Sequence, residues 1–455
     1  MKEKSSLIHD MTSGSVLKLI VTFSAPLFLS NALQAVYNMV DMIVVGRVLG
    51  QNGLSAVSVG GDLLSCLQFV AIGISSAGSV QIAQLVGMKD QKRLSALIGT
   101  IFTFLALCAL VMMGTCLALQ GQILNWLNTP PDARAFAEDY ATTCTLGLIF
   151  IYGYNAVSAI LRGMGDSRRP FIFVSIAAIL NVMLDILFVA VLGWQVFGAA
   201  LATVIAQGVS FLCCMAYLVR HRGQFGFDFR LKSFAIRKQA LLPLLKLGIP
   251  MAVQTASVQF SKLFVSSWVN SAGVIVSAVS GIAGKISSVC NLCATAISTA
   301  AAMMVGQNIG ARKPERVTRT LKVTYVLGLA IAAVLSAVIL LFPRAVFGIF
   351  TESAEILAVC MEFLPCAVLT FLGQGLRGPN SAIINGSGNS ALNFAVAFLD
   401  SLVVRIGVSY LLGVVLRMGY VGFWYGNAIA GYVPVLLGTL YYRSGRWKTR
   451  TIVRA

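Results

Sequence analysis

The stretch Ser158-Ala-Ile-Leu-Arg-Gly-Met-Gly-Asp-Ser167 recurs later in the chain as Ser381-Ala-Ile-Ile-Asn-Gly-Ser-Gly-Asn-Ser390. Six of the ten positions are identical, and the copies begin at 158 and at 381, a shift of 223 along the chain. The same shift, within one residue, aligns Gln84, Gly87 and Arg93 with Gln307, Gly310 and Arg316, and Gly198 with Gly422. Apolar sequence often matches by chance, but not at one nearly constant shift. The chain therefore holds two copies of one unit.

The composition places this unit in a membrane. Hydrophobic residues make up 58% and charged residues 11% of the 455 residues, whereas about a quarter of an ordinary soluble domain is charged. A membrane-spanning helix needs about 20 mainly apolar residues. The apolar runs predict twelve spans, at 17–46, 53–86, 95–118, 137–161, 170–192, 197–219, 241–269, 275–308, 320–342, 355–383, 391–415 and 420–441.

We therefore expect an all-α integral membrane protein with twelve transmembrane helices in two six-helix lobes. Six helices per copy give both copies the same orientation, so a pseudo-twofold axis runs along the membrane normal. The predicted divisions are an N-terminal lobe at 1–219, a basic cytoplasmic linker at 220–240, and a C-terminal lobe with a basic tail at 241–455.

The basic residues that give the net charge of +18 are distributed as this membrane topology predicts. They lie between apolar runs, in alternate loops and in the tail, and not on one solvated face as nucleic-acid binding requires. By the positive-inside rule both termini are cytoplasmic, and the linker contacts the cytoplasmic leaflet. We expect a multi-pass plasma membrane protein that binds no nucleic acid. The first apolar run, from about Leu17 to Leu49, is too long for a cleaved signal peptide and stays as helix one.

Two acids lie deep in spans of the N-terminal half, where an ionisable group costs at least about 2.5–3.5 kcal/mol. Each shares a helix face with an amide, in the pairs Asn38 with Asp41 and Asn181 with Asp185. Further side-chain oxygens in this half come from Asn155 and Thr203. Such a set can hold a proton or a hard cation such as sodium. The alternative is a hydrogen-bond network that only joins the helices.

The C-terminal half lacks that set, because the shift of 223 puts Val404 and Val408 where Asn181 and Asp185 stand. Ion coupling is therefore expected in the N-terminal lobe. Asp400 and Arg405 are five residues apart and should not share a helical face, so each is expected to pair with another helix.

Other candidate residues bear on the conformational change and on substrate binding. Pro26 and Pro250 interrupt helices one and seven and predict hinges or simple packing bends. Asp62 and Lys285 occupy equivalent positions at the shift of 223, although a shift of 222 would put Gly284 there, and this suggests an outer gate. The alternatives are partners within their own lobes, or attraction of a cationic substrate by Asp62. Candidates for a substrate cavity are Lys262, Tyr37, Tyr152 and Met303, which could equally be packing residues.

No constellation for catalysis is evident. The ten cysteines lie within apolar runs, and only Cys290-x-x-Cys293 has a spacing that suggests zinc or redox chemistry, for which it lacks partners. We expect no enzyme activity, no bound metal and no cofactor beyond the coupling ion.

Three segments carry a family resemblance: Pro26 to Gly46 with its Val40-Asp41 and Val45-Gly46 pairs, Gln84-x-x-Gly87, and Gly163-x-Gly165-Asp166-Ser167. With them, nearly the whole chain resembles the multidrug and toxic compound extrusion (MATE) family, and its acids resemble those of the DinF-type prokaryotic branch. The resemblance implies proton- or sodium-driven efflux through Asp41 and Asp185, with Asn155, Asn181 and Thr203 as neighbours. Branches with an acid in helix seven match less well, because Lys262 is found there.

The leading function is thus secondary active antiport by alternating access, in which a proton or sodium ion enters while a small organic, often cationic and amphipathic, molecule leaves. The alternative is a flippase for a lipid-linked precursor, which a basic cavity with Lys262, Lys285 and Arg405 would favour. We expect small-molecule substrates and membrane lipid as partners of a monomer.

Overall fold

The computed structural model describes residues 8–127, 129–224 and 226–450. Every regular element in these ranges is helical. Nine of the helices are long and apolar enough to cross a membrane, or ten if one bent pair counts as a single span. The predicted all-α membrane fold is confirmed.

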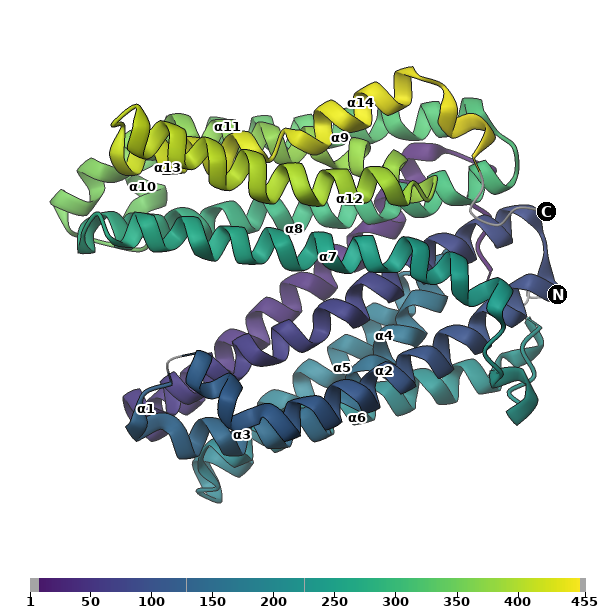
Figure 1. The fold of residues 1–455 in the computed structure, drawn as a ribbon, viewed down its shortest axis with the longest axis horizontal. Helices are drawn as coiled ribbons and strands as arrows, with labels where there is room; N and C mark the ends of the chain where they lie inside the picture. Colours follow the sequence, from purple (N-terminus) through teal and green to yellow (C-terminus); the bar gives the residue numbers. More distant parts are fainter. Residues whose placement is uncertain (1–7, 128, 225, 451–455) are drawn as a thin grey trace. The chain divides into compact units, whose positions relative to one another are not determined.

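The helices of the first half of the chain are labelled in Figure 1. They are α1 (Val16–Met88), α2 (Gln91–Trp126), α3 (Arg134–Leu146), α4 (Leu148–Gly163), α5 (Arg168–Asp185) and α6 (Gln195–Arg220). Those of the second half are α7 (Lys238–Asn270), α8 (Val274–Gly310), α9 (Pro314–Leu341), α10 (Pro343–Gly348), α11 (Ala354–Gly386), α12 (Ser390–Phe398), α13 (Gly419–Ala430) and α14 (Val433–Arg443). Three π-helical segments extend them: η2 (Ile186–Val191), η5 (Leu399–Val408) and η6 (Leu411–Val415).

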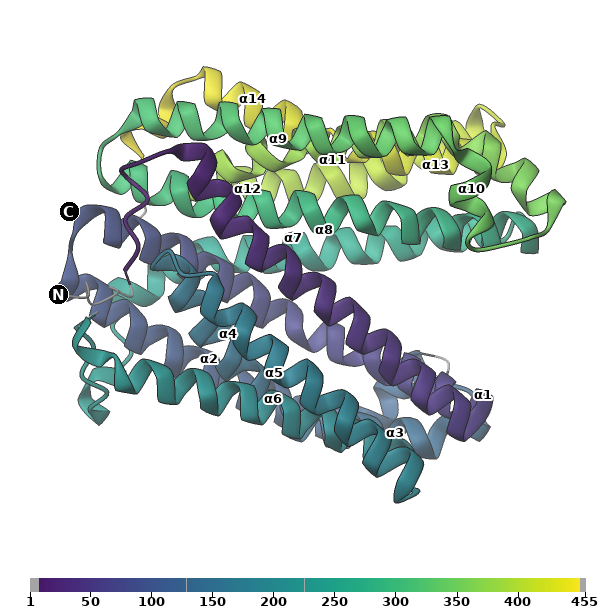
Figure 2. The same ribbon diagram turned by 180° about the vertical axis from the view of Figure 1, so that it is seen from behind.

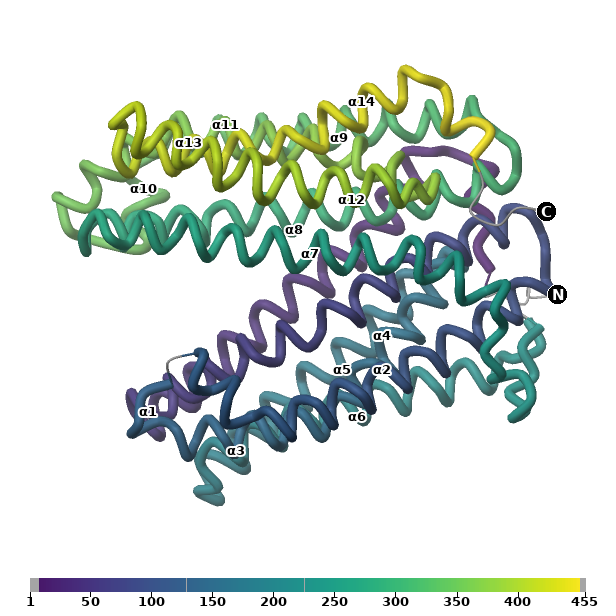
Figure 3. Tube along the Cα trace, in the orientation of Figure 1, coloured from purple at the N-terminus to yellow at the C-terminus, as the bar shows by residue number. Residues whose placement is uncertain are grey.

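These elements account for the twelve predicted spans. The first two spans lie in α1, where Gly50 has non-helical angles of φ 66° and ψ −152°; the tube in Figure 3 follows the chain through this break. The fourth span is the pair α3 and α4, bent by 46°. The eleventh continues from α12 through η5 and η6, and the twelfth combines α13 with α14.

The helices form two compact units. Among the described residues, the first unit comprises 8–10 and those between 29 and 252, and the second comprises 11–28 and 253–450. The start of α1 thus belongs to the second unit and the start of α7 to the first, a pattern that the predicted divisions at 219 and 241 do not contain. Within the second unit, α8, α9 and α11 lie side by side (Figure 2).

The repeated stretch forms the same turn in both units. Gly165 and Gly388 have φ values of 90° and 71°, in the left-handed region that glycine adopts most readily. The next amides, those of Asp166 and Asn389, donate to the carbonyls of Leu161 and Ile384 at 2.9 and 3.0 Å. The side chains of the same two residues then accept the amides of Arg169 and Leu392, each at 3.2 Å, and so cap the following helix. Every pair in this turn is related by the shift of 223 that relates the two sequences.

The first glycine of the repeated stretch permits a close helix contact. A Cβ on Gly163 would lie 2.7 Å from the Ser79 carbonyl oxygen, and a Cβ on Gly386 would lie 2.7 Å from the Ala302 carbonyl oxygen. The helices α4 and α1, and equivalently α11 and α8, therefore touch through their backbones. The repeat is thus a repeat of packing as well as of sequence.

The linker between the halves is docked on α2. Phe227, Phe229 and Phe234 surround Phe102, with ring centroids 5.8 to 6.5 Å from it. The Arg237 amide donates to the Thr100 hydroxyl at 3.2 Å. Within the linker, a hydrogen bond from Ser233 holds the pKa of Asp228 below its usual value.

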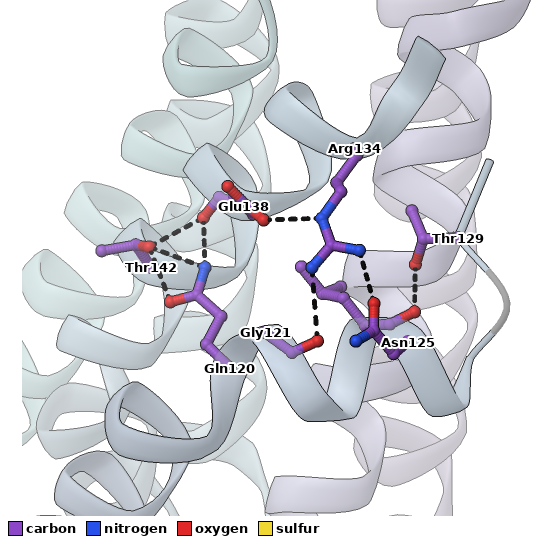
Figure 4. Close-up of polar contacts among 8 residues, drawn as sticks. Gln120, Gly121, Asn125, Thr129, Arg134, Glu138 and Thr142 are labelled. Carbon is purple, nitrogen blue, oxygen red and sulfur yellow. Dashed lines mark hydrogen bonds and ion pairs between the residues drawn. The ribbon is translucent and has the colours of Figure 1, made fainter. Parts of the chain in front are cut away.

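A polar cluster joins the ends of α2 and α3 (Figure 4). Gln120 donates to the Glu138 carbonyl at 2.8 Å and exchanges hydrogen bonds with Thr142. Arg134 pairs with the Glu138 carboxylate at 3.0 Å and donates to Asn125 and to the Gly121 carbonyl. These bonds fix the entry into α3, which supplies one side of the site described next.

Candidate functional site

Two buried carboxylates lie together in the first unit. Asp41 of α1 is 7% exposed, and Asp185, the last residue of α5 before η2, is fully buried. They are close enough to interact electrostatically. Among the described residues, Oδ1 of Asp41 and both carboxylate oxygens of Asp185 have no hydrogen-bond partner. A buried carboxylate without compensation is costly, so these groups require a proton or a cation.

Tyr140 completes this pair and was missed by sequence reasoning. This residue of α3 is 4% exposed and interacts with both Asp41 and Asp185. Tyr37, four residues before Asp41 in α1, interacts with Asp41 and with Gln207 of α6. An aromatic residue in an apolar run gives no signal of such a role, because most are packing residues.

The amide and hydroxyl residues predicted to surround the two acids differ in their burial and in their hydrogen-bond partners. Asn181 of α5 donates to the Thr203 hydroxyl of α6 at 3.3 Å, and its own buried Oδ1 has no partner among the described residues. Asn155 of α4 is half-buried and donates to the Ile151 carbonyl of its own helix. Asn38 has an exposed side chain although Asp41, three residues on, is buried.

The other candidates occupy varied positions. Asp62 and Lys285 are exposed, each in its own unit, and neither forms an ion pair within the described residues. Tyr152 is fully buried, with its hydroxyl donating to the Leu67 carbonyl at 2.6 Å. Met303 is 3% exposed and packed in the core. Pro26 and Pro250 lie inside α1 and α7.

The expectation that Asp400 and Arg405 do not face each other is wrong. Arg405 Nη2 lies 2.7 Å from Asp400 Oδ1, and Arg377 of α11 lies 3.4 Å from Asp400 Oδ2. Both residues of the closer pair lie in η5, which is π-helical. A π-helix bonds residue i to residue i+5, so residues five apart come to the same face. Arg405 also donates to Asn427 of α13, as expected for a partner on another helix.

Comparison with known proteins places these features in context. The sequence profile of the MatE family matches residues 26–187 and 250–411, two segments whose starts at 26 and 250 give an offset of 224. A curated relative, "Probable multidrug resistance protein YoeA" of Bacillus subtilis (strain 168), is 30% identical over 447 residues, or 97% of this chain and 96% of that protein.

Solved structures share the fold over nearly the whole chain. One is described as "Outward-facing conformation of a multidrug resistance MATE family transporter of the MOP superfamily", with a TM-score of 0.89, 25% identity, and coverage of 98% of this chain and 100% of that chain. Another is described as "Reverse polarity of binding pocket suggests different function of a MOP superfamily transporter from Pyrococcus furiosus Vc1 (DSM3638)". It has a TM-score of 0.88 and 23% identity, and covers 99% of this chain and 100% of that chain.

Proposed function

The chain belongs to the MatE family and is a multidrug efflux transporter of the plasma membrane, and from that premise we propose that it is an antiporter driven by protons that bind at Asp41 and Asp185. The observation that carries the proposal is the unpartnered state of these buried carboxylates. In their charged form they would repel each other, and one proton shared between them removes that cost.

Protons fit this pair better than sodium does. Sodium needs several oxygen ligands at once, and the described side chains that interact with Asp185 are those of Asp41 and Tyr140. The Asn181 Oδ1 atom, which also lacks a partner, keeps sodium as the second candidate. Antiport then follows if proton binding and substrate binding favour opposite orientations of the two units. Both termini are proposed to face the cytoplasm.

The test is dye efflux from right-side-out membrane vesicles loaded with ethidium or carboxyfluorescein, one probe of each charge. We expect transport under an imposed pH gradient and none under a sodium gradient of equal size. Asp41→Asn keeps the side-chain volume but cannot bind and release a proton. Efflux should therefore fall to the level of vesicles that lack the transporter.

The matched control is Asp139→Asn, which changes an exposed acid of α3 in the same unit and should leave efflux unchanged. Wild-type efflux by a well-expressed Asp41→Asn protein would refute the coupling site. Efflux that follows the sodium gradient instead would assign the site to sodium.

A further inference from the structure

The second unit contains an open cavity of about 730 Å³. Its walls come from α7, α8, α11, α12 and α13, and from the π-helical segment η5. This volume falls within the range of about 300–1,000 Å³ typical of small-molecule sites. All of the lining residues belong to the second unit, so the cavity is separate from the carboxylate pair of the first.

The cavity is cationic. Lys262, Arg377 and Arg405 line it, and no acid is found among its described lining residues. Asp400 is fully buried beneath the two guanidinium groups and pairs with both. One carboxylate therefore faces three cations, and two positive charges stay uncompensated.

Lys262 is the cation that internal packing does not explain. A structural ion-pair cluster accounts for Arg377, Asp400 and Arg405, but Lys262 has neither a hydrogen bond nor an ion pair among the described residues. It lies close enough to Arg377 and Arg405 to be repelled by both. Lys262 is exposed on α7, so its charge is accessible to an anion that enters the cavity.

Unpartnered polar atoms lie in the same walls. They are Nε of Arg405, Oε1 of Gln374, Oδ1 of Asn385 and Nδ2 of Asn393, all buried and without a partner among the described residues. Arg405 itself is only 3% exposed. Buried donors and acceptors are normally satisfied, so the walls of this cavity hold polar groups that packing within the unit leaves uncompensated. Guanidinium groups bind carboxylates and phosphates through charge-assisted hydrogen bonds.

We infer that this cavity binds a small amphipathic organic anion by its carboxylate or phosphate group, with Lys262 and Arg377 as the contacting cations. Phe363, Phe423 and Trp424 line the cavity and offer apolar surface for the body of such a ligand. That the bound anion is also exported rests on the proposed efflux function. Binding itself does not.

The test measures binding of carboxyfluorescein by fluorescence polarisation to purified full-length protein in phosphatidylcholine nanodiscs. Lys262→Gln should raise the Kd about tenfold, because one charge-assisted contact is lost. Lys262→Arg keeps the charge and should bind within about threefold of the wild type. Ethidium, the cationic probe, should bind no more weakly to Lys262→Gln than to the wild type.

Lys322→Gln is the matched control, because Lys322 is an exposed lysine of the same unit that does not line the cavity. It should leave the Kd unchanged. The proposal is overturned if Lys262→Gln binds carboxyfluorescein as the wild type does, or if Lys322→Gln loses as much affinity.

Two further measurements distinguish a lipid anion from an anion in water, and anion binding from proton coupling. If phosphatidylglycerol added to the nanodiscs displaces the dye from the wild type, but does not change binding to Lys262→Gln, the site takes a lipid phosphate. If phosphatidylglycerol has no effect on the wild type, it takes an anion from water. Carboxyfluorescein binding in nanodiscs is measured without an ion gradient, so a failed coupling test in vesicles and a failed anion site give different results.

Discussion

At the scale of single residues, Asp185 illustrates a conflict between stability and function. It is fully buried with both carboxylate oxygens unpartnered. We expect Asp185→Asn to leave the thermal midpoint of the purified protein unchanged or higher, because the amide removes a buried acid at nearly constant volume. Efflux should fall sharply in the same protein. A lower midpoint would mean that the carboxylate supports the fold.

For the buried ion pair of Asp400 and Arg405 in η5, we expect that substitution lowers the stability of the protein. Removing Arg405 leaves Asp400 fully buried with Arg377 as its only remaining ion-pair partner among the described residues. Arg405→Met should therefore reduce the free energy of unfolding by about 3 kcal/mol. Adding Asp400→Leu should restore part of that loss, because the buried carboxylate is then gone and the remaining cation, Arg377, has a side chain that is 30% exposed. Fully additive losses in the double-mutant cycle would show that the two side chains are not coupled.

The sequence could identify a functional residue only where its charge makes membrane insertion unfavourable. Asp41 and Asp185 could be identified because an acid in an apolar run is conspicuous. Tyr140 could not, since a tyrosine in such a run is ordinary. The pairing of Asp400 with Arg405 was also hidden, because helical periodicity assumes α-helical geometry and a π-helix changes which residues share a face.

At the scale of elements, the repeated glycine predicts a specific sensitivity. In Gly386→Ala the new Cβ would lie 2.7 Å from the Ala302 carbonyl oxygen, so α11 and α8 must move apart. We expect a loss of about 1–3 kcal/mol in the free energy of unfolding. Gly281→Ala in α8 is the control, because its Cβ meets nothing within 4 Å. Equal stability of both variants, measured by denaturation in detergent, would contradict the close contact.

The elements themselves were largely readable from the sequence, and their breaks less so. Long apolar runs and the repeated Gly-x-Gly turn give the spans and one of their connections. The bend between α3 and α4 and the break between α13 and α14 were not predicted. Neither interruption contains a charge cluster, so the apolar signal continues through both.

At the scale of the whole molecule, Asp62 and Lys285 remain a gate hypothesis. Both are exposed and occupy equivalent positions in the two halves. If they pair in one state of the transport cycle, each single reversal, Asp62→Lys or Lys285→Asp, should slow efflux, and the double reversal should recover it. A double reversal no faster than either single variant, with no crosslink between cysteines at these sites, would exclude the gate.

The division of α1 and α7 between the two units also predicts whether the two halves of the chain can fold separately. Each unit includes a segment from the opposite half of the chain, residues 11–28 in one case and the start of α7 in the other. Halves cut after Gly223 should therefore be unstable when produced alone, because each lacks a part of its unit. Produced together, they should restore efflux in vesicles. A stable, monodisperse half on its own would contradict this expectation.

The exchanged segments end at equivalent places, because the boundaries at Leu29 and Val253 are related by the same offset of 224 that relates the two family matches. Symmetrical exchange of one segment is the arrangement of a domain-swapped dimer. A half-length ancestor would have assembled as two identical subunits that each lent the other the first turns of a helix. Fusion of two copies of such a gene would make that dimer a single chain, in which the two copies are free to differ in their buried charges.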